Sequence, residues 1–404
     1  MSRWRPAAAA CTRSCGWGWG SLRPAPPAGC RRRRSPRRGR AFPLRSLRFL
    51  HRRLILSLFP RCGDNPGRWR GHTLKAIDKV TLGLPDWPAL FRAFGSRHEP
   101  PRLGPVSVEL CCVFAVLPRI PLAWVFGKAG AHEHHLFRRL LDRLRKRDLL
   151  LLDNGFYSFR LFAMIIGRKG NFVIPMARNT RPKVVARLGG HDYLVEIRDS
   201  KAPSARPLRL RLVYVYRRGF RRRRLLTSLL DPTRHPADEL AALYHLRWDI
   251  ETFYRDFKDT MQARTWHCQT PDSFAKELAM HMIVVVLVRR AMLAAAASRG
   301  VQPARISFAR ALTEARLLLR RISSCLPEEI RDACREMVAE CARYVIAVRP
   351  GRQYPRDRQV YRAKARGMRQ RRRGRPAKPK PQDPPENSRP ETFTCCNGVT
   401  YALS

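Results

Sequence analysis

The chain has 404 residues, and its 81 Lys and Arg against 31 Asp and Glu give a formal net charge of +50. Such a charge destabilises a compact chain by self-repulsion unless a polyanion neutralises it, and nucleic acid is the polyanion whose phosphates bind Lys and Arg. The longest apolar run, Leu278 to Val288, stops at two arginines and is too short to cross a bilayer. A membrane protein is therefore not expected.

The 12 cysteines include no C-x-x-C pair, which argues against a zinc ribbon. A chain of this length and arginine content also differs from a small disulfide scaffold, so we expect a reducing cytosol. The basic N-terminus lacks the apolar segment of a signal peptide.

The first part of the chain predicts a basic disordered region followed by a mixed α/β core. Residues 1–68 are rich in Arg, Pro, Ala and Gly, with one helical stretch at 47–59. The segments predicted after it are strands at 73–85, 106–117 and 120–127, a helix at 131–147, a strand at 148–155 buried on both faces, a helix at 156–170 and a strand at 171–177.

The second part predicts an antiparallel β-region, then helices. Four strand-like stretches occupy 183–230. One uninterrupted helix is expected from Pro236 through Lys258, a second from about Ser273 to Ala297, and two or three shorter helices to about 345. The expected division is a disordered N-terminal region at 1–68, the first part of a catalytic core at 69–182, a β-rich insertion at 183–232, the second part of the core at 233–298, C-terminal helices at 299–348 and a disordered Pro- and Arg-rich tail at 349–404.

The segment "YHLRWDIETFYRDFK" (244–258) singles out one carboxylate. At about 100° per residue, an apolar stripe forms from Leu243, Leu246, Ile250, Phe253 and Phe257. The strip beside it holds Tyr244, Arg247, Glu251 and Lys258, whereas the other two nearby acids, Asp249 and Asp256, face the opposite side. The alternative is a solvated helix in which Arg247 and Glu251 form an ordinary ion pair.

Two further acids lie in strands. Asp78 is inside the first predicted strand, and Asp153 ends the buried strand "LLLLD" at the edge where open α/β sheets bind ligands. A carboxylate in a strand core is costly unless a partner or a metal takes its charge. Together with Glu251, these acids would suit two divalent cations such as Mg²⁺, which activate water and stabilise the leaving oxygen in phosphodiester transfer.

The spacing of Tyr244, Arg247, Glu251 and Lys258 resembles the Tyr-x2-Arg-x3-Glu-x6-Lys signature of one group of DDE transposases of bacterial insertion sequences. "AIDKVTLGLPD" and "LLLLDNGFYSF" are similar to the segments that carry the family's first and second Asp. The resemblance covers about 69–290, and the predicted β-region between Asp153 and Glu251 matches an insertion of that family.

The resemblance implies an α/β ribonuclease H-like core with an antiparallel β insertion before the last catalytic helix. It implies that Asp78, Asp153 and Glu251 are catalytic and hold two Mg²⁺ ions, with Mn²⁺ as a substitute. Tyr244, Arg247 and Lys258 would bind DNA phosphates. The implied reaction is hydrolysis that frees a 3′-hydroxyl, which then attacks target DNA, in a homodimer on double-stranded DNA in the bacterial cytoplasm, at the nucleoid.

The sequence departs from the family at two points. Lys79 and Val80 follow the first Asp in place of Gly and a small hydroxyl residue, and Asn154 follows the second in place of Arg. The alternative function is therefore an inactive or truncated relic that only binds DNA.

Two other motifs have ordinary alternatives. "HEHH" (132–135) lacks the spacing of a zinc-protease helix and is expected to start a helix at the surface. "RRRGRPAK" (371–378) resembles an AT-hook, but a basic tail that binds any phosphate explains it equally.

Overall fold

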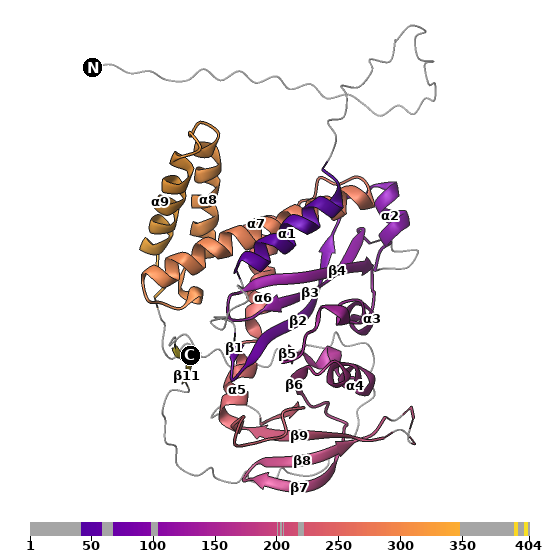
Figure 1. Cartoon of the computed structure of the whole chain (residues 1–404). Helices are drawn as coiled ribbons and strands as arrows, with labels where there is room; N and C mark the ends of the chain where they lie inside the picture. Colours follow the sequence, from indigo (N-terminus) through magenta and orange to yellow (C-terminus); the bar gives the residue numbers. More distant parts are fainter. Residues whose placement is uncertain are drawn as a thin grey trace, which may run out of the picture. The chain divides into compact units, whose positions relative to one another are not determined.

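The computed structural model describes residues 42–58, 68–97, 104–199, 201–202, 204, 206–216 and 222–347, and the backbone of two paired strands, β11 (Thr392–Thr394) and β12 (Thr400–Ala402) (Figure 1). Most of the two tails that the sequence predicts to be disordered lies outside these residues, as does the AT-hook-like motif at 371–378.

Within the described residues, the fold is built on one ten-stranded sheet with the order β4-β3-β2-β5-β6-β10-β9-β8-β7, and β1 (Arg68–Trp69) pairs with the start of β2. The first half holds β2 (His72–Gly83), β3 (Ser107–Ala115) and β4 (Ile120–Lys128), which are antiparallel, then β5 (Asp148–Leu152) and β6 (Asn171–Pro175), which run parallel to β2. This is the mixed sheet of a ribonuclease H-like core, as expected.

The second half of the sheet is the predicted antiparallel β-region. It consists of β7 (Lys183–Gly189), β8 (Asp192–Ile197), β9 (Leu208–Val215) and β10 (Arg223–Thr227). These strands continue the core sheet, because β10 pairs antiparallel with β6 and places Leu225 opposite Pro175. The antiparallel β-region and the acid-bearing strands thus belong to one hydrogen-bonded sheet.

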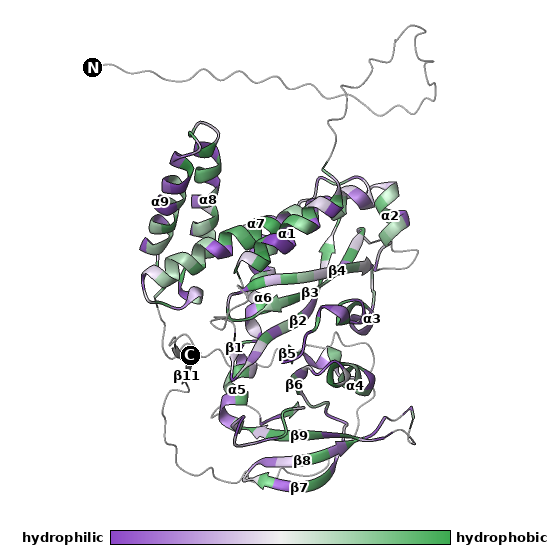
Figure 2. Ribbon diagram, viewed as in Figure 1, coloured by the Kyte–Doolittle hydropathy of each residue, from purple (hydrophilic) through white to green (hydrophobic). Residues whose placement is uncertain are grey.

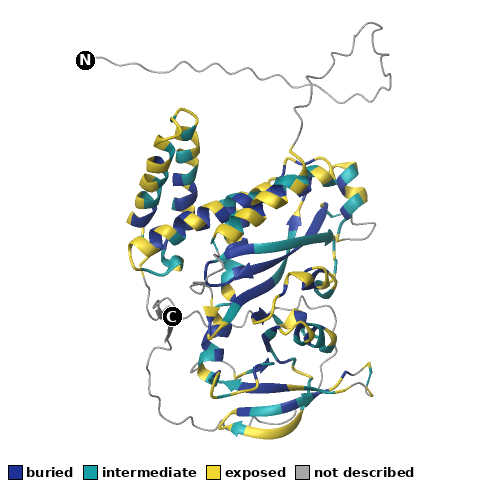
Figure 3. Ribbon diagram, viewed as in Figure 1, coloured by how far each residue is buried: buried dark blue, intermediate teal, exposed yellow. Residues whose placement is uncertain are grey.

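Helices cover both faces of the sheet, because the central strands are apolar on both sides. One face packs against α2 (Pro88–Phe94), α5 (Ala237–His245), α6 (Trp248–Arg255) and α7 (Pro271–Ser298), and the other against α3 (Glu133–Arg138) and α4 (Phe159–Gly167). Figure 3 shows the contrast between β3, buried throughout, and β7, which is exposed along most of its length at the sheet edge.

The helix α7 is the longest described helix, and Thr270 caps it by accepting from the Ser273 N–H. By length and composition alone it could cross a membrane, but most of its apolar stretch is buried inside the protein. It packs against α1 (Leu44–Leu58), and against α8 (Phe308–Ile322) and α9 (Glu329–Arg343) (Figure 2). It is therefore a core helix, as predicted.

The helix predicted at 131–147 is wrong in length. Only α3 is α-helical, followed by a single 3₁₀ turn, η1 (Leu141–Arg143). The Asp148 carboxylate accepts from the Arg145 N–H at 2.7 Å and turns the chain into β5.

The helix predicted from Pro236 through Lys258 is also wrong in its continuity. The N–H of Leu246 and of Arg247 each bond to a carbonyl three residues back, at 3.0 and 3.1 Å, which tightens the chain between α5 and α6. After α6 the chain widens into a π-helical turn, η3 (Asp256–Thr260). Such turns are rare in proteins overall, and those that occur are frequently at functional sites.

Candidate active site

The two acids lie side by side on central strands, Asp78 within β2 and Asp153 directly after β5. In the parallel pairing of β2 with β5, Ile77 is opposite Leu152, and Asp78 and Asp153 are the next residues of the two strands. Neighbouring strands are about 4.8 Å apart. The sequence prediction required adjacent strands, and the structure places them so.

The turn after Asp153 is supported by α3. It is a 3₁₀ turn, η2 (Asn154–Phe156), and the Gly155 carbonyl lies 2.9 Å from His134 Nε2. A Cβ on Gly155 would lie 2.0 Å from a Glu133 carboxylate oxygen, so any other residue there would displace the Glu133 side chain. The "HEHH" stretch begins α3 as expected, with His132 Nδ1 accepting from the His134 N–H.

Two tyrosines bind α5 and α6 to the strands that carry the acids. The Tyr244 hydroxyl, at the end of α5, donates to the Leu152 carbonyl at 3.1 Å, one residue before Asp153. The Tyr254 hydroxyl, on α6, donates to the carbonyl of Asp78 itself at 2.7 Å. The helix that bears Glu251 is thus fixed over both acids.

Arg247 and Glu251 form an ion pair at 2.7 Å above the two strand acids. Arg247 is buried, and its Nε has no hydrogen-bond partner among the described residues. Burial lowers the pKa of Arg247, but Tyr244, Asp153 and Glu251 outweigh burial and hold its pKa above the ordinary value. The guanidinium therefore lies within the field of the acids.

Asp78 has the most perturbed carboxyl of the site. Burial raises its pKa to about 6, and the carboxylates of Asp153 and Glu251 add to the rise. The Lys79 N–H, which donates to Asp78 Oδ1 at 2.8 Å, and the charge of Arg247 oppose it. Three carboxyl groups therefore act on one another here, and a cation between them would relieve the repulsion.

The donor set of this site fits a hard divalent cation, because all three groups are carboxylates and one of them is poorly compensated. As placed, no three His, Cys, Asp or Glu side chains of the described residues are arranged to hold a metal ion. Glu251 binds Arg247, and its side chain is 36% exposed, so it has room to exchange this partner.

The sequence is similar to known transposases. Residues 91–287 match the family described as "Transposase DDE domain". Over 303 residues, 71% of this chain and 68% of the relative, the chain is 29% identical to the transposase InsG for insertion sequence element IS4 of Escherichia coli (strain K12). The chain is therefore similar to DDE transposases of insertion sequences.

A solved structure of the piggyBac transposase in a synaptic complex with hairpin DNA is similar at a TM-score of 0.35 and 14% identity, over 69% of this chain and 58% of that one. This distant likeness carries no weight here. The family match begins after Asp78, so the assignment of Asp78 to the candidate site rests on the strand register.

Two of the residues predicted to contact DNA, Tyr244 and Lys258, lie in environments that differ from each other. Tyr244 is buried with its hydroxyl bonded to the backbone, which favours a positioning role over a phosphate contact. Lys258 is half-buried in η3, where burial first and then Arg264 lower its pKa. Asp259 and Glu109 are the acids that act on it, so the structure does not bring Lys258 to the three carboxylates.

The departure at Lys79 has a structural account. Its side chain projects to the sheet face opposite Asp78, where Nζ lies 3.4 Å from the buried Glu109 and donates to the Ala131 carbonyl at 3.2 Å. The Lys79 ammonium is therefore part of an internal ion network on the other face of the sheet from the three carboxylates.

The acids on the far side of the helix are also accounted for. Asp249 pairs with Arg119, and Asp256 pairs with the buried Arg289 at 2.7 Å. Glu251 is thus the acid of this segment that faces the strand carboxylates. The sequence prediction also singled out Glu251 but did not include Tyr254, although the place of Tyr254 three residues after Glu251 on the same helix face was a usable signal.

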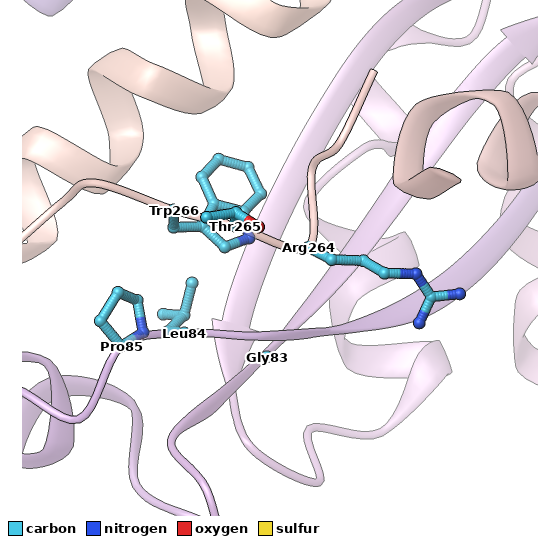
Figure 4. A pocket seen from close by; sticks show the side chains of 6 residues that line it. All are labelled: Gly83, Leu84, Pro85, Arg264, Thr265 and Trp266. Atoms are coloured by element: carbon cyan, nitrogen blue, oxygen red, sulfur yellow. The ribbon is translucent and has the colours of Figure 1, made fainter. Parts of the chain in front are cut away.

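One pocket of about 340 Å³ lies at the far end of β2, lined by Gly83, Leu84, Pro85, Arg264, Thr265 and Trp266 (Figure 4). Figure 4 shows Trp266 opposite Leu84 and Pro85, with the Arg264 side chain directed away. No acid lines it, and it begins five strand residues from Asp78, about 16 Å away at 3.3 Å per residue. This pocket is therefore separate from the three carboxylates.

Proposed function

We propose that this protein is a transposase that cuts and joins DNA in a divalent-cation-dependent reaction at Asp78, Asp153 and Glu251. The observation that carries the proposal is the strand register, which sets a carboxylate inside β2 beside one directly after β5, under the helix that bears the third. The pKa of Asp78, which burial raises first and the neighbouring carboxylates raise further, supports it, because a cation would stabilise the ionised form.

Asp78, Asp153 and Glu251 would hold Mg²⁺ ions, or Mn²⁺ in their place, and the ions would supply an activated water and stabilisation of the leaving oxygen. To complete this shell, Glu251 would release Arg247. The freed guanidinium, with five donors in a fixed fork, is then available to a DNA phosphate beside the acids.

The substrates in this proposal are double-stranded transposon ends and target DNA. Hydrolysis at an end frees a 3′-hydroxyl, which attacks the target strand. Lys258, on the π-helical turn after α6, would bind phosphate farther from the carboxylates than Arg247 does. Bringing two ends together favours a homodimer on DNA, in a bacterial cytoplasm at the nucleoid. The expected division of the chain at 69–182, 183–232 and 233–298 belongs to the same proposal.

The test is a cleavage assay on the natural substrate. Purified full-length protein is incubated with Mg²⁺ and DNA from both flanks of its own gene, and the products are mapped at nucleotide resolution. We expect nicks at the element ends in Mg²⁺ or Mn²⁺ and none with EDTA or with Asp153→Asn.

The Arg247–Glu251 pair favours one alternative, a relic that binds DNA without cutting it. In such a protein the pair is permanent and the carboxylate shell never closes. Binding of the end DNA without nicking in either cation, at any protein concentration, establishes the relic and excludes the enzyme.

A further inference from the structure

We infer that Tyr254 is a positioning residue of the active site, and that its hydroxyl sets the place of Glu251 relative to Asp78. The inference rests on the proposed function, because it concerns the same three carboxylates. Its core is one contact: the hydroxyl donates to the backbone carbonyl of Asp78 at 2.7 Å.

The contact links Glu251 to Asp78 through only one turn of α6. Tyr254 and Glu251 are three residues apart on α6 and so lie on the same helix face. The Tyr254 hydroxyl ends on the peptide group of Asp78, not on a neighbouring residue. Any displacement of α6 that moves Glu251 therefore also breaks or strains this hydrogen bond.

The surroundings make the contact rigid. Tyr254 is 5% exposed, and its ring lies 5.2 Å from Phe253, which stacks on Phe114 of β3. Cys112, the residue opposite Asp78 in β3, places its thiol at the same hydroxyl. A water has no access to replace the hydroxyl, so its removal leaves the carbonyl with one partner fewer.

Glu251 depends on this anchor because its own side chain has few. Its side chain is 36% exposed and forms an ion pair with Arg247, which Glu251 must release to bind a cation. At that moment the helix alone holds the carboxylate in place. Groups that orient metal ligands from outside the shell typically change metal affinity or activity by about 10–100-fold when removed.

Tyr244 forms the second point of the same clamp. Its hydroxyl donates to the Leu152 carbonyl, next to Asp153, at 3.1 Å, and it stands at the junction between α5 and α6. The two hydroxyls therefore register the helices against both acid-bearing strands. This role differs from the phosphate contact that the sequence predicts for Tyr244.

The experiment compares three full-length variants that each lose one hydroxyl: Tyr254→Phe, Tyr244→Phe and, as a matched control, Tyr344→Phe. Tyr344 loses a comparable bond, from Arg310 at 3.0 Å, in the α8–α9 hairpin. Three quantities are measured for each: Mn²⁺ affinity without DNA, by electron paramagnetic resonance; affinity for end DNA in EDTA; and the thermal midpoint.

We expect Tyr254→Phe and Tyr244→Phe to bind Mn²⁺ about tenfold more weakly than the unsubstituted protein, with DNA affinity in EDTA unchanged. Cleavage should be recovered in part at high Mn²⁺. Tyr344→Phe should match the unsubstituted protein in both affinities.

A merely structural tyrosine gives a different pattern. If Tyr254→Phe lowers the thermal midpoint but binds Mn²⁺ normally, or weakens Mn²⁺ and DNA binding equally, the positioning role is wrong while the proposed function stands. If Tyr254→Phe does not fold, Tyr244→Phe decides in the same way. If the unsubstituted protein binds no Mn²⁺ and cuts no DNA, the proposed function fails and this inference falls with it.

Discussion

Replacing Asp78 by Asn should stabilise the protein at neutral pH while abolishing its chemistry. The pKa of Asp78 rises from the ordinary 3.8 to about 6, first through burial. Each pKa unit corresponds to about 1.4 kcal/mol, so the ionised carboxylate costs the folded state about 3 kcal/mol before any allowance for residual hydration. With that allowance we expect a gain of about 1.5–3 kcal/mol.

The sign follows from proton binding. Between pH 4 and pH 6 the folded protein holds a proton on Asp78 that the unfolded chain has released, so the free energy of unfolding falls as pH rises through this range. Above it the cost is complete, and well below pH 4 it is absent. Asn keeps the oxygen that accepts from the Lys79 N–H and cannot ionise.

The assay is urea unfolding of both proteins in EDTA at pH 4.0 and pH 7.5. Asp78→Asn should exceed the unsubstituted protein in stability at the higher pH and match it within error at the lower. With Mg²⁺ at pH 7.5, only the unsubstituted protein should gain stability, because a ligand that binds the folded state stabilises it. An Asn variant that is equally or less stable at pH 7.5 refutes the reasoning.

Three further predictions separate DNA grip, chemistry and stability. Glu251→Gln should bind end DNA normally or slightly more tightly and cut nothing in Mg²⁺. Arg247→Ala should bind end DNA more weakly and recover part of its cutting at high protein concentration. Nicking by Glu251→Gln in a gel assay contradicts the role of Glu251 as a metal ligand. Deletion of residues 349–404 should weaken binding on all DNA sequences about equally and flatten the dependence of the binding constant on salt, while a loss confined to A·T-rich DNA in titrations would favour the AT-hook. Arg289→Met should lower the free energy of unfolding by about 3 kcal/mol, because it leaves the Asp256 carboxylate unpaired against the core. The control, Arg335→Met at an exposed residue, should change the free energy of unfolding by less than about 0.5 kcal/mol in the same denaturant titration. Equal effects would mean that the buried pair is dispensable.

Local patterns predicted much of the core. The run of leucines before Asp153 marks a strand buried on both faces, and this strand lies at the centre of the sheet beside β2. The apolar stripe of the 244–258 segment is buried as predicted, except that Leu246 is only partly so. These features follow from periodicity, which is a property of neighbouring residues.

Long-range contacts determined what the sequence did not predict. The π-helical turn begins at Asp256, which is held by Arg289 from α7, 33 residues away. This turn shifts Lys258 out of the line that an unbroken helix would give it. The bond from Tyr254 to Asp78 spans 176 residues. No local pattern contains such pairs.

The order of the strands and helices also has a consequence for synthesis of the chain. Asp153 and Glu251 are separated by 251 − 153 = 98 residues, which include α4, the remaining strands of the sheet and α5. At a translation rate of roughly 5–20 residues per second, the ribosome needs about 5–20 s to add them. During this interval a nascent chain displays both strand acids without the helix that completes them. Under the proposed function, the growing polypeptide would therefore not cut nearby DNA until α6 has emerged and docked, and any product that terminates before Glu251 is expected to lack nuclease activity however well its first strands fold.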